Sequence, residues 1–313
     1  MLSAQEINQY QRHLSLPSFG IAGQEKLKSA SVLVIGAGGL GCSVLQYLAA
    51  VGVGKIGIVD QDVIEVSNLQ RQILYGYVDV GESKSEVAAK KIKGINPFIE
   101  VLAYSIHFNS TNAESVLEDY QIVVDGTDNF ASRYLINDAC VIFNKVLVYG
   151  AIYQFEGQVS VFNYKNGPTY RCLFPEPPKS NALPSCSELG VLGVLPGIIG
   201  NFQALEVIKL ITEMGTVLSG KVLLFDALEQ RSRLLSIKRQ SESDKIISLK
   251  DHSIDCENIM NNKTQGEIVE INPNQFYEMK VKEKDILLLD VREDWERKIS
   301  KISPSLHIPL GEF

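Results

Sequence analysis

The sequence predicts an α/β fold with a doubly wound, mostly parallel sheet that continues into antiparallel strands. The first observation is that short apolar runs alternate with helix-like runs over the first half of the 313 residues. A βαβα order of this kind is typical of parallel sheets. The second observation is a glycine-rich turn between the first apolar run and the helix-like segment after it. The length and the 45 % of apolar residues allow one large domain and part of a second.

The expected elements follow in chain order. The N-terminal segment begins with Ser3-x-x-Glu6, the pattern of a capping box, and predicts an amphipathic helix. A second capping box is predicted at Ser83-x-x-Glu86. Strand-like runs lie at 32–35, 56–60, 99–104, 122–125 and 146–150, and helix-like runs lie around 40–50, 84–94, 112–118 and 131–143.

The pattern changes after residue 150. The runs at 157–164, 221–226 and 231–237 predict antiparallel strands, the proline-rich 172–190 predicts a surface loop, and about 197–214 predicts a long apolar helix. We interpret 1–237 as one domain and the polar, aperiodic 238–265 as a linker. The remainder, 266–313, resembles the opening half of a small α/β domain and is too short for a core of its own.

The composition excludes several classes of protein. The net charge is −7 and no long basic run occurs, which argues against a nucleic-acid partner. Five scattered cysteines lack the spacing of a disulfide framework, so we expect a reduced, intracellular protein. No signal-peptide pattern opens the chain, and no uncharged apolar stretch is long enough to cross a bilayer. We therefore expect a cytoplasmic protein without membrane contact.

The glycine turn points to a nucleotide. Gly36-x-Gly38-x-x-Gly41 lies between the first strand and the first helix, and Asp60 ends the second strand. This arrangement is typical of Rossmann-like folds, in which glycines let the backbone approach a phosphate or ribose and an acid binds the ribose. The turn favours an adenine nucleotide, but it does not choose between NAD and ATP.

Hydrogen-bonding side chains crowd the segment VSNLQRQILY, residues 66–75, directly after that acid. Arg71 can clamp a phosphate through two N–H groups. Lys84 lies in the first turn of a predicted helix, where a cation opposes the helix dipole, so an anionic ligand would account for it. The alternatives are a charged turn and a solvated lysine.

A third polar segment, DGTDN at 125–129, follows the fourth strand. Ligands of parallel sheets lie at the carboxyl ends of the strands. Asp128 can hold Mg²⁺ against a polyphosphate, and the alternative is a helix cap, for which Asp and Asn are well suited. Together, Arg71, Lys84 and Asp128 predict a triphosphate site.

GAGGLG, the D-x-D at 60–62, SNLQRQ, VG-x-x-K and DGTDN-x-x-x-R resemble, in order and spacing, the motifs of the MoeB/ThiF/HesA family. These proteins are the prokaryotic relatives of ubiquitin-activating enzymes, and the resemblance runs from about Tyr10 to 237. It implies an adenylyltransferase that uses ATP and Mg²⁺. The implied substrate is the C-terminal glycine of a ubiquitin-like sulfur carrier ending in Gly-Gly, similar to MoaD or ThiS. Activation of this glycine would serve sulfur transfer to molybdopterin, thiamine or related products.

The resemblance also implies roles for single residues. Asp60 would bind the ribose, Asp128 would organise Mg²⁺, and Arg12 would reach the ATP site of the neighbouring subunit in a homodimer. Cys186, in the segment SCSELGV, is a candidate for a covalent link to the carrier, and this role stays open. The remaining implied nucleotide-binding positions are Gly36, Gly38, Gly39, Gly41, Asp62, Ser67, Asn68, Gln70, Arg71, Gln72, Lys84 and Asn129.

The chain departs from the family at its zinc site. Many members hold zinc with two Cys-x-x-Cys pairs, but here Thr169 takes the first position and leaves Cys172 alone. The second pair is replaced by KRQSESDK, and Cys256 with His252 lies further on at irregular spacing. We therefore expect no structural zinc.

The tail, LLLDVRE-x-WE to IPLGEF, resembles the first half of a rhodanese domain. Asp290 and Trp295 match that pattern, but these 313 residues end before the position of the persulfide cysteine. We therefore do not predict sulfur transfer by them, and the segment is either truncated or degenerate.

Three alternatives remain. An NAD-dependent oxidoreductase would leave SNLQRQ and Lys84 unexplained and lacks a Tyr-x-x-x-Lys or His–carboxylate arrangement. A non-catalytic scaffold would not need Arg71, Lys84 and Asp128 together. A family member that acts on a peptide or a tRNA base is the third possibility, and the sequence does not identify the carrier or the pathway.

Overall fold

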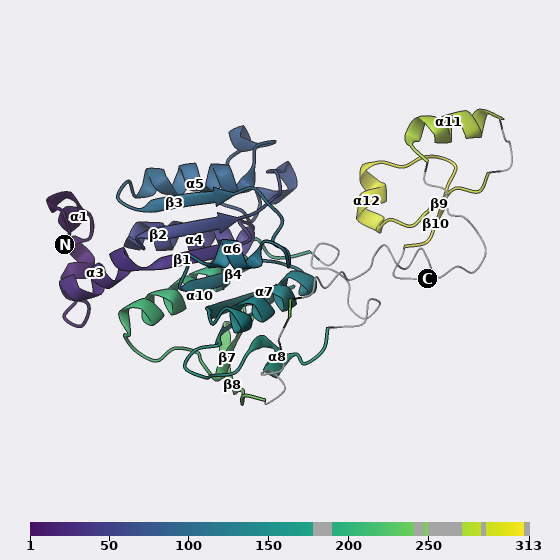
Figure 1. The fold of residues 1–313 in the computed structure, drawn as a ribbon. Coiled ribbons are helices and arrows are strands. Elements are labelled where there is room, and N and C mark those ends of the chain that lie inside the picture. Colours follow the sequence, from purple (N-terminus) through teal and green to yellow (C-terminus); the bar gives the residue numbers. More distant parts are fainter. Residues whose placement is uncertain (178–189, 241–245, 247, 250–270, 283–285, 310–313) are drawn as a thin grey trace. The chain divides into compact units, whose positions relative to one another are not determined.

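The computed structural model describes residues 1–177, 190–240, 246, 248–249, 271–282 and 286–309 (Figure 1). The chain divides into two compact units, Met1–Cys256 and Glu257–Phe313. The division falls inside the segment that the sequence predicts as a linker, 238–265. Each unit is described by itself.

The described part of the first unit is built on an eight-stranded sheet with the order β3-β2-β1-β4-β5-β6-β7-β8. The strands are β1 (Ser31–Ile35), β2 (Lys55–Val59), β3 (Glu100–Tyr104), β4 (Ile122–Asp125), β5 (Val146–Tyr153), β6 (Glu156–Phe162), β7 (Lys221–Asp226) and β8 (Arg231–Ser236). Neighbours from β3 to β5 pair in parallel, and those from β5 to β8 pair antiparallel. The predicted fold class is confirmed.

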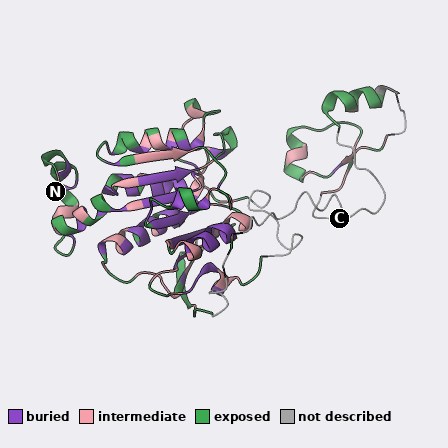
Figure 2. Cartoon of the chain, in the orientation of Figure 1, coloured by how far each residue is buried: buried purple, intermediate pink, exposed green. Residues whose placement is uncertain are grey.

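Helices cover both faces of the sheet (Figure 1). One core contains side chains of α4 (Gly39–Val51), α5 (Lys84–Ile95) and α10 (Val194–Thr212), and the other contains those of α6 (Ala113–Leu117) and α7 (Phe130–Ile142). Strand β1 serves both cores because its side chains alternate: Val32 and Val34 join the first, and Leu33 and Ile35 join the second. Figure 2 shows the central strands as buried, as expected of parallel strands covered on both faces.

The N-terminal segment forms three helices, α1 (Ala4–Gln9), α2 (Gln11–Leu14) and α3 (Gly20–Ser29), where the sequence predicts one. Its capping box is confirmed: the N–H of Ser3 donates to Glu6 Oε2 at 2.7 Å, and the N–H of Glu6 donates to Ser3 Oγ at 3.2 Å.

The second predicted capping box is wrong. Ser83 is the N-cap residue of α5, but its side chain makes no capping hydrogen bond. Its hydroxyl instead lies 3.2 Å from that of Ser85 and 2.9 Å from that of Ser105. The reason is tertiary: Ser105 directly follows β3, which runs beside β2, and its hydroxyl competes with the helix N–H groups for Ser83.

Helix α10 bears on the expectation that no uncharged apolar stretch could cross a membrane, and it carries two charged residues, Glu206 and Lys209. It is long and apolar enough to do so by length and composition alone, with half of the tested window buried inside the unit. Leu195, Ile199, Ala204 and Val207 are buried against the cores. Pro196 lies in its first turn, where the missing N–H has no helical partner to lose. We therefore interpret α10 as a core helix.

The remaining short elements of the first unit are η1 (Val66–Asn68), η2 (Tyr77–Asp79) and α8 (Tyr170–Leu173). The described part of the second unit contains α11 (Pro273–Lys282), β9 (Leu289–Asp290), α12 (Asp294–Ile299) and β10 (Leu306–His307). Strands β9 and β10 pair in parallel. Hydrogen bonds from Arg292 lower the pKa of Asp290 to about 2.

The turn after β1 depends on its glycines. Gly36 has a φ of +95°, and a Cβ on Gly41 would lie 1.9 Å from the carbonyl oxygen of Gly36. Because that neighbour is backbone, we expect Gly41→Ala to lower the free energy of unfolding by about 3 kcal/mol, measured by urea denaturation. Gly94→Ala is the matched control, since a Cβ at this position has no atom within 4 Å. Because Gly94 lies inside α5, this variant should raise the free energy of unfolding by at most about 1 kcal/mol. Equal urea midpoints for Gly41→Ala and the parent would contradict this account of the turn.

Candidate active site

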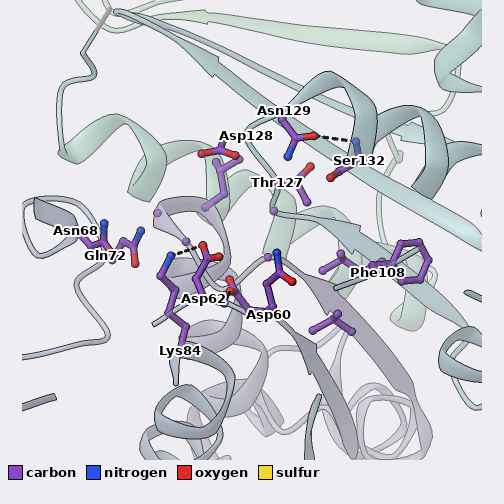
Figure 3. A pocket seen from close by; sticks show the side chains of 18 of the residues that line it. Asp60, Asp62, Asn68, Gln72, Lys84, Phe108, Thr127, Asp128, Asn129 and Ser132 are labelled. Carbon is purple, nitrogen blue, oxygen red and sulfur yellow. Dashed lines mark hydrogen bonds and ion pairs between the residues drawn. The ribbon is translucent and has the colours of Figure 1, made fainter. Parts of the chain in front are cut away.

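A cavity of about 640 Å³ opens at the carboxyl ends of the parallel strands. Strand β1 lies between β2 and β4 there, so successive connections leave in opposite directions, and α/β sheets bind ligands at such switch points. Most of the predicted nucleotide-binding residues lie here (Figure 3). Those that line the cavity are Gly36, Gly38, Gly39, Asp60, Asp62, Asn68, Arg71, Gln72, Lys84, Asp128 and Asn129.

Asp60 connects the glycine turn to the end of β2 through hydrogen bonds. The N–H of Ala37 donates to its Oδ2 at 2.8 Å, and the N–H of Asp62 donates to its Oδ1 at 2.9 Å. Burial raises the pKa of Asp60, and these two hydrogen bonds lower it in part. The carboxylate therefore shapes the turn in addition to facing the cavity (Figure 3).

Lys84 is buried at the cavity wall and pairs with a neighbouring acid. Its side chain is 8 % exposed, and its Nζ lies 2.8 Å from Asp62 Oδ2, as the dashed line in Figure 3 marks. The hydroxyl of Tyr75 donates to the carbonyl oxygens of Ala37 at 2.8 Å and of Lys84 at 3.2 Å. These bonds tie the start of α5 to the glycine turn. An ammonium carries three N–H donors, so Lys84 can also bind an anion in the cavity.

The segment after η1 supplies the guanidinium. Arg71 is half-buried at the cavity wall, and its Nη1 donates to the carbonyl oxygen of Ser67 at 3.2 Å. Asn68 holds the turn in place, because its Oδ1 accepts the N–H of Glu65 at 3.2 Å. Arg71 therefore lies at the cavity wall, and its guanidinium forms no ion pair with the described residues.

Two predicted residues of this segment lie outside the cavity lining. Ser67 donates its hydroxyl to Glu65 Oε2 at 3.1 Å. Gln70 packs against the start of α10, since a Cβ on Gly193 would lie 2.2 Å from the Gln70 carbonyl oxygen. Gly41 also lies outside it, below the turn, where its contact with Gly36 allows the first turn of α4 to approach.

Asp128 differs from its neighbours, because its carboxylate has no partner among the described residues. Thr127 donates its N–H and hydroxyl to Asp125 Oδ1 at 2.9 and 2.6 Å, and Asn129 Oδ1 accepts the N–H of Ser132 at 2.9 Å and so caps α7. Asp128 is exposed at the cavity, and no hydrogen bond or ion pair joins its carboxylate to the described parts of the chain. A carboxylate of this kind is a suitable ligand for Mg²⁺, which often takes one or two carboxylates plus phosphate oxygens. The helix cap, which the sequence analysis gives as the alternative role for this segment, is formed by Asn129.

The other predicted residues are placed as follows. Arg12 is exposed on α2 and does not line the cavity of its own chain. Cys186 and Cys256 lie outside the described residues. Cys172 is buried, and the N–H groups of Thr169 and Gln240 donate to its sulfur at 3.3 Å each. No group of three or more His, Cys, Asp or Glu able to hold a metal occurs among the residues that the structure describes.

Sequence reasoning missed part of the cavity wall. Ile106, His107 and Phe108 line it after β3, and Pro196 lines it from α10. The rule that ligands lie at the carboxyl ends of parallel strands would have found the first three, had it been applied to β3. This rule does not predict Pro196, which lies in a helix far along the chain. Only the fold brings Pro196 close to Gly39, so that a Cβ added to Gly39 would lie 2.9 Å from the Pro196 Cβ.

The fold and the cavity define a nucleotide-binding α/β protein with cationic and acidic groups at one end of the site. Residues 10–246 match the ThiF family, and the chain belongs to that family. The membership expected from the motifs is therefore confirmed.

Individual relatives agree with this assignment. The chain is 52 % identical over 240 residues to the sulfur carrier protein adenylyltransferase of Thermus thermophilus, which covers 75 % of this chain and 89 % of that protein. It is 43 % identical over 314 residues to the probable adenylyltransferase/sulfurtransferase MoeZ of Mycobacterium tuberculosis, covering 98 % of this chain and 80 % of that one. A crystal structure of E. coli MccB with AMPCPP and MccA superposes with a TM-score of 0.65 at 25 % identity, covering 75 % of this chain and 72 % of MccB.

Proposed function

We propose that the protein uses ATP to adenylate the C-terminal glycine of a ubiquitin-like sulfur carrier. The observation that carries the proposal is the grouping of Arg71, Lys84 and the unpartnered Asp128 around a nucleotide-binding glycine turn. The expected enzyme class agrees with the names of the relatives from Thermus thermophilus and Mycobacterium tuberculosis. An NAD-dependent reaction would leave these three charged groups without a task.

The chemistry requires little beyond positioning. A carboxylate oxygen of the terminal glycine attacks the α-phosphorus of ATP, an O–P bond forms, and pyrophosphate leaves with the electrons of the broken bond. No proton has to move, because the attacking carboxylate is ionised at neutral pH. The task of the protein is therefore to align the reactants and neutralise charge, which Arg71 and Lys84 do at the phosphates.

We propose that Asp128 holds Mg²⁺ in this site. The support is its free carboxylate at the cavity wall, next to the cationic residues. When bound, the ion supplies charge neutralisation for the departing pyrophosphate. Asn129 is engaged as a helix cap through its Oδ1, so Asp128 is the one of the two with free acceptor oxygens.

We further propose a homodimer in which Arg12 completes the site of the partner. Arg12 is exposed on α2, makes no hydrogen bond or ion pair with the described part of the chain, and lies outside its own cavity lining. We place the protein in the cytoplasm, since Cys42 and Cys140 are buried cysteines outside any disulfide and thiols persist in a reducing compartment. A covalent role of Cys186 stays a prediction.

The test is ATP–pyrophosphate exchange against a panel of small carriers that end in Gly-Gly. We expect exchange that requires Mg²⁺ and one or few of the carriers, and none with the same carrier after removal of its last glycine. The panel includes short peptides, because peptide-dependent exchange without any carrier response would move the substrate to that class. Reduction of a nicotinamide cofactor without any exchange would overturn the proposal.

A further inference from the structure

One buried polar atom in the cavity wall is not explained by the fold. Gln72 is 3 % exposed, and its Oε1 has no hydrogen-bond partner within the described part of the chain. Among the described residues that line the cavity, it is the one that holds such an atom. A buried acceptor without a donor costs free energy, so native proteins rarely keep one without a reason.

The position of Gln72 is fixed by its backbone. Its N–H donates to the carbonyl oxygen of Asn68 at 2.9 Å, which closes the turn after η1. The side chain is directed toward the cavity (Figure 3), and its Nε2 would lie 3.8 Å from a Cβ on Gly38. By contrast, the side-chain oxygens of Asn68 and Asn129 each accept a backbone N–H. Gln72 therefore has a free acceptor beside the glycine turn.

The chemistry of that acceptor selects its ligand. A carbonyl oxygen needs a donor, and the oxygens of a triphosphate offer none. The ribose hydroxyls are donors, but Asp60 is the acceptor proposed for them. Gln72 follows Arg71 directly and lies on the segment that supplies the phosphate-binding guanidinium. The proposed reaction also brings a further donor to the phosphate-binding residues, the N–H of the last peptide bond of the carrier.

We propose that Gln72 Oε1 accepts the N–H of the carrier's terminal glycine and so places its carboxylate for attack. This inference rests on the proposed function. It makes Gln72 a specificity-determining residue, because a terminus without that N–H would leave the buried oxygen unpaired in the complex.

The test compares two carriers in two proteins. One carrier is native, and the other is semisynthetic, with an ester in place of the last peptide bond so that oxygen replaces the N–H. With the parent protein, we expect the ester to raise the KM for the carrier about tenfold in pyrophosphate exchange. With Gln72→Met, which has a similar volume and no acceptor oxygen of this kind, the two carriers should differ less than about twofold when both are measured at saturating ATP.

Gln72→Glu is the second variant, because it keeps the acceptor and should keep the tenfold ratio between the carriers even if its added charge weakens ATP binding. Thermal unfolding checks the fold: Gln72→Met should melt no lower than the parent, since it removes an unpaired buried oxygen. An equal carrier ratio in the parent and in Gln72→Met would overturn the inference. Absence of exchange in the parent with every carrier would instead count against the proposed function.

Discussion

Asp128→Ala is expected to lower carrier-dependent pyrophosphate exchange by at least about 100-fold at saturating Mg²⁺ while leaving the fold intact. The loss follows from removing the cavity-lining carboxylate that we propose as the Mg²⁺ ligand. The side chain is exposed and unpartnered within the described residues, so the free energy of unfolding should change by less than about 0.5 kcal/mol. Exchange kinetics and urea denaturation measure the two effects separately.

Asp119→Ala is a suitable control for this variant. It removes the same side chain from an exposed position outside the cavity lining, where Asp119 pairs with Lys55 at 2.7 Å. Such surface pairs contribute little, so both activity and stability should stay near the parent values. An Asp128→Ala protein that exchanges pyrophosphate as fast as the parent would show that the magnesium assignment is incorrect.

Arg12→Ala is expected to reduce exchange by about a thousandfold, and mixing it with inactive Asp128→Ala protein should restore activity. In a two-fold symmetric dimer, random reassortment of equal amounts yields mixed dimers as half of the population. Each mixed dimer has one site with an intact Asp128 and an intact Arg12 from the partner. The mixture should therefore recover about a quarter of the parent activity after subunit exchange.

The matched control mixes Asp128→Ala with Lys84→Ala. Both residues line the cavity of the same chain, so no mixed dimer regains a complete site and the mixture should stay inactive. If the Arg12→Ala mixture also stays inactive while native mass spectrometry shows mixed dimers, Arg12 does not act across the interface. A monomer in that measurement would exclude the homodimer itself.

Much of the fold is predictable because it depends on local patterns. Runs of buried aliphatic residues such as Val32 to Ile35 are typical of strands covered on both faces, and their alternation with helices indicates a parallel sheet. The errors arise where a tertiary neighbour decides. Ser83 has the sequence of a helix cap, but its hydroxyl lies at hydrogen-bonding distance from that of Ser105, which follows β3.

The residues of the candidate site also fall into two groups, those predictable from local sequence and those that depend on the tertiary fold. Asp60 and Lys84 were found because strand ends and helix dipoles make their side chains unusual at those places. Phe108 and Pro196 carry no such local signal, and they line the cavity only because β3 and α10 are placed beside the glycine turn. Gln72 is a third case. The sequence motif predicts the residue itself, but its unpaired side-chain oxygen results from burial in the fold, which residue spacing does not reveal.

If Lys84 binds a polyphosphate as proposed, its ion pair with Asp62 affects how strongly that ligand is held. A buried ammonium without a counterion would form a strong new ion pair with a nucleotide. In the protein without nucleotide, however, the unpaired buried charge would lower stability. Here the charge is already compensated, and the compensating carboxylate is 59 % exposed. Under the proposed function, a phosphate at Lys84 would share the ammonium with Asp62 and would not meet an uncompensated charge. The ion pair would then moderate the affinity for ATP, and it would ease the release of pyrophosphate.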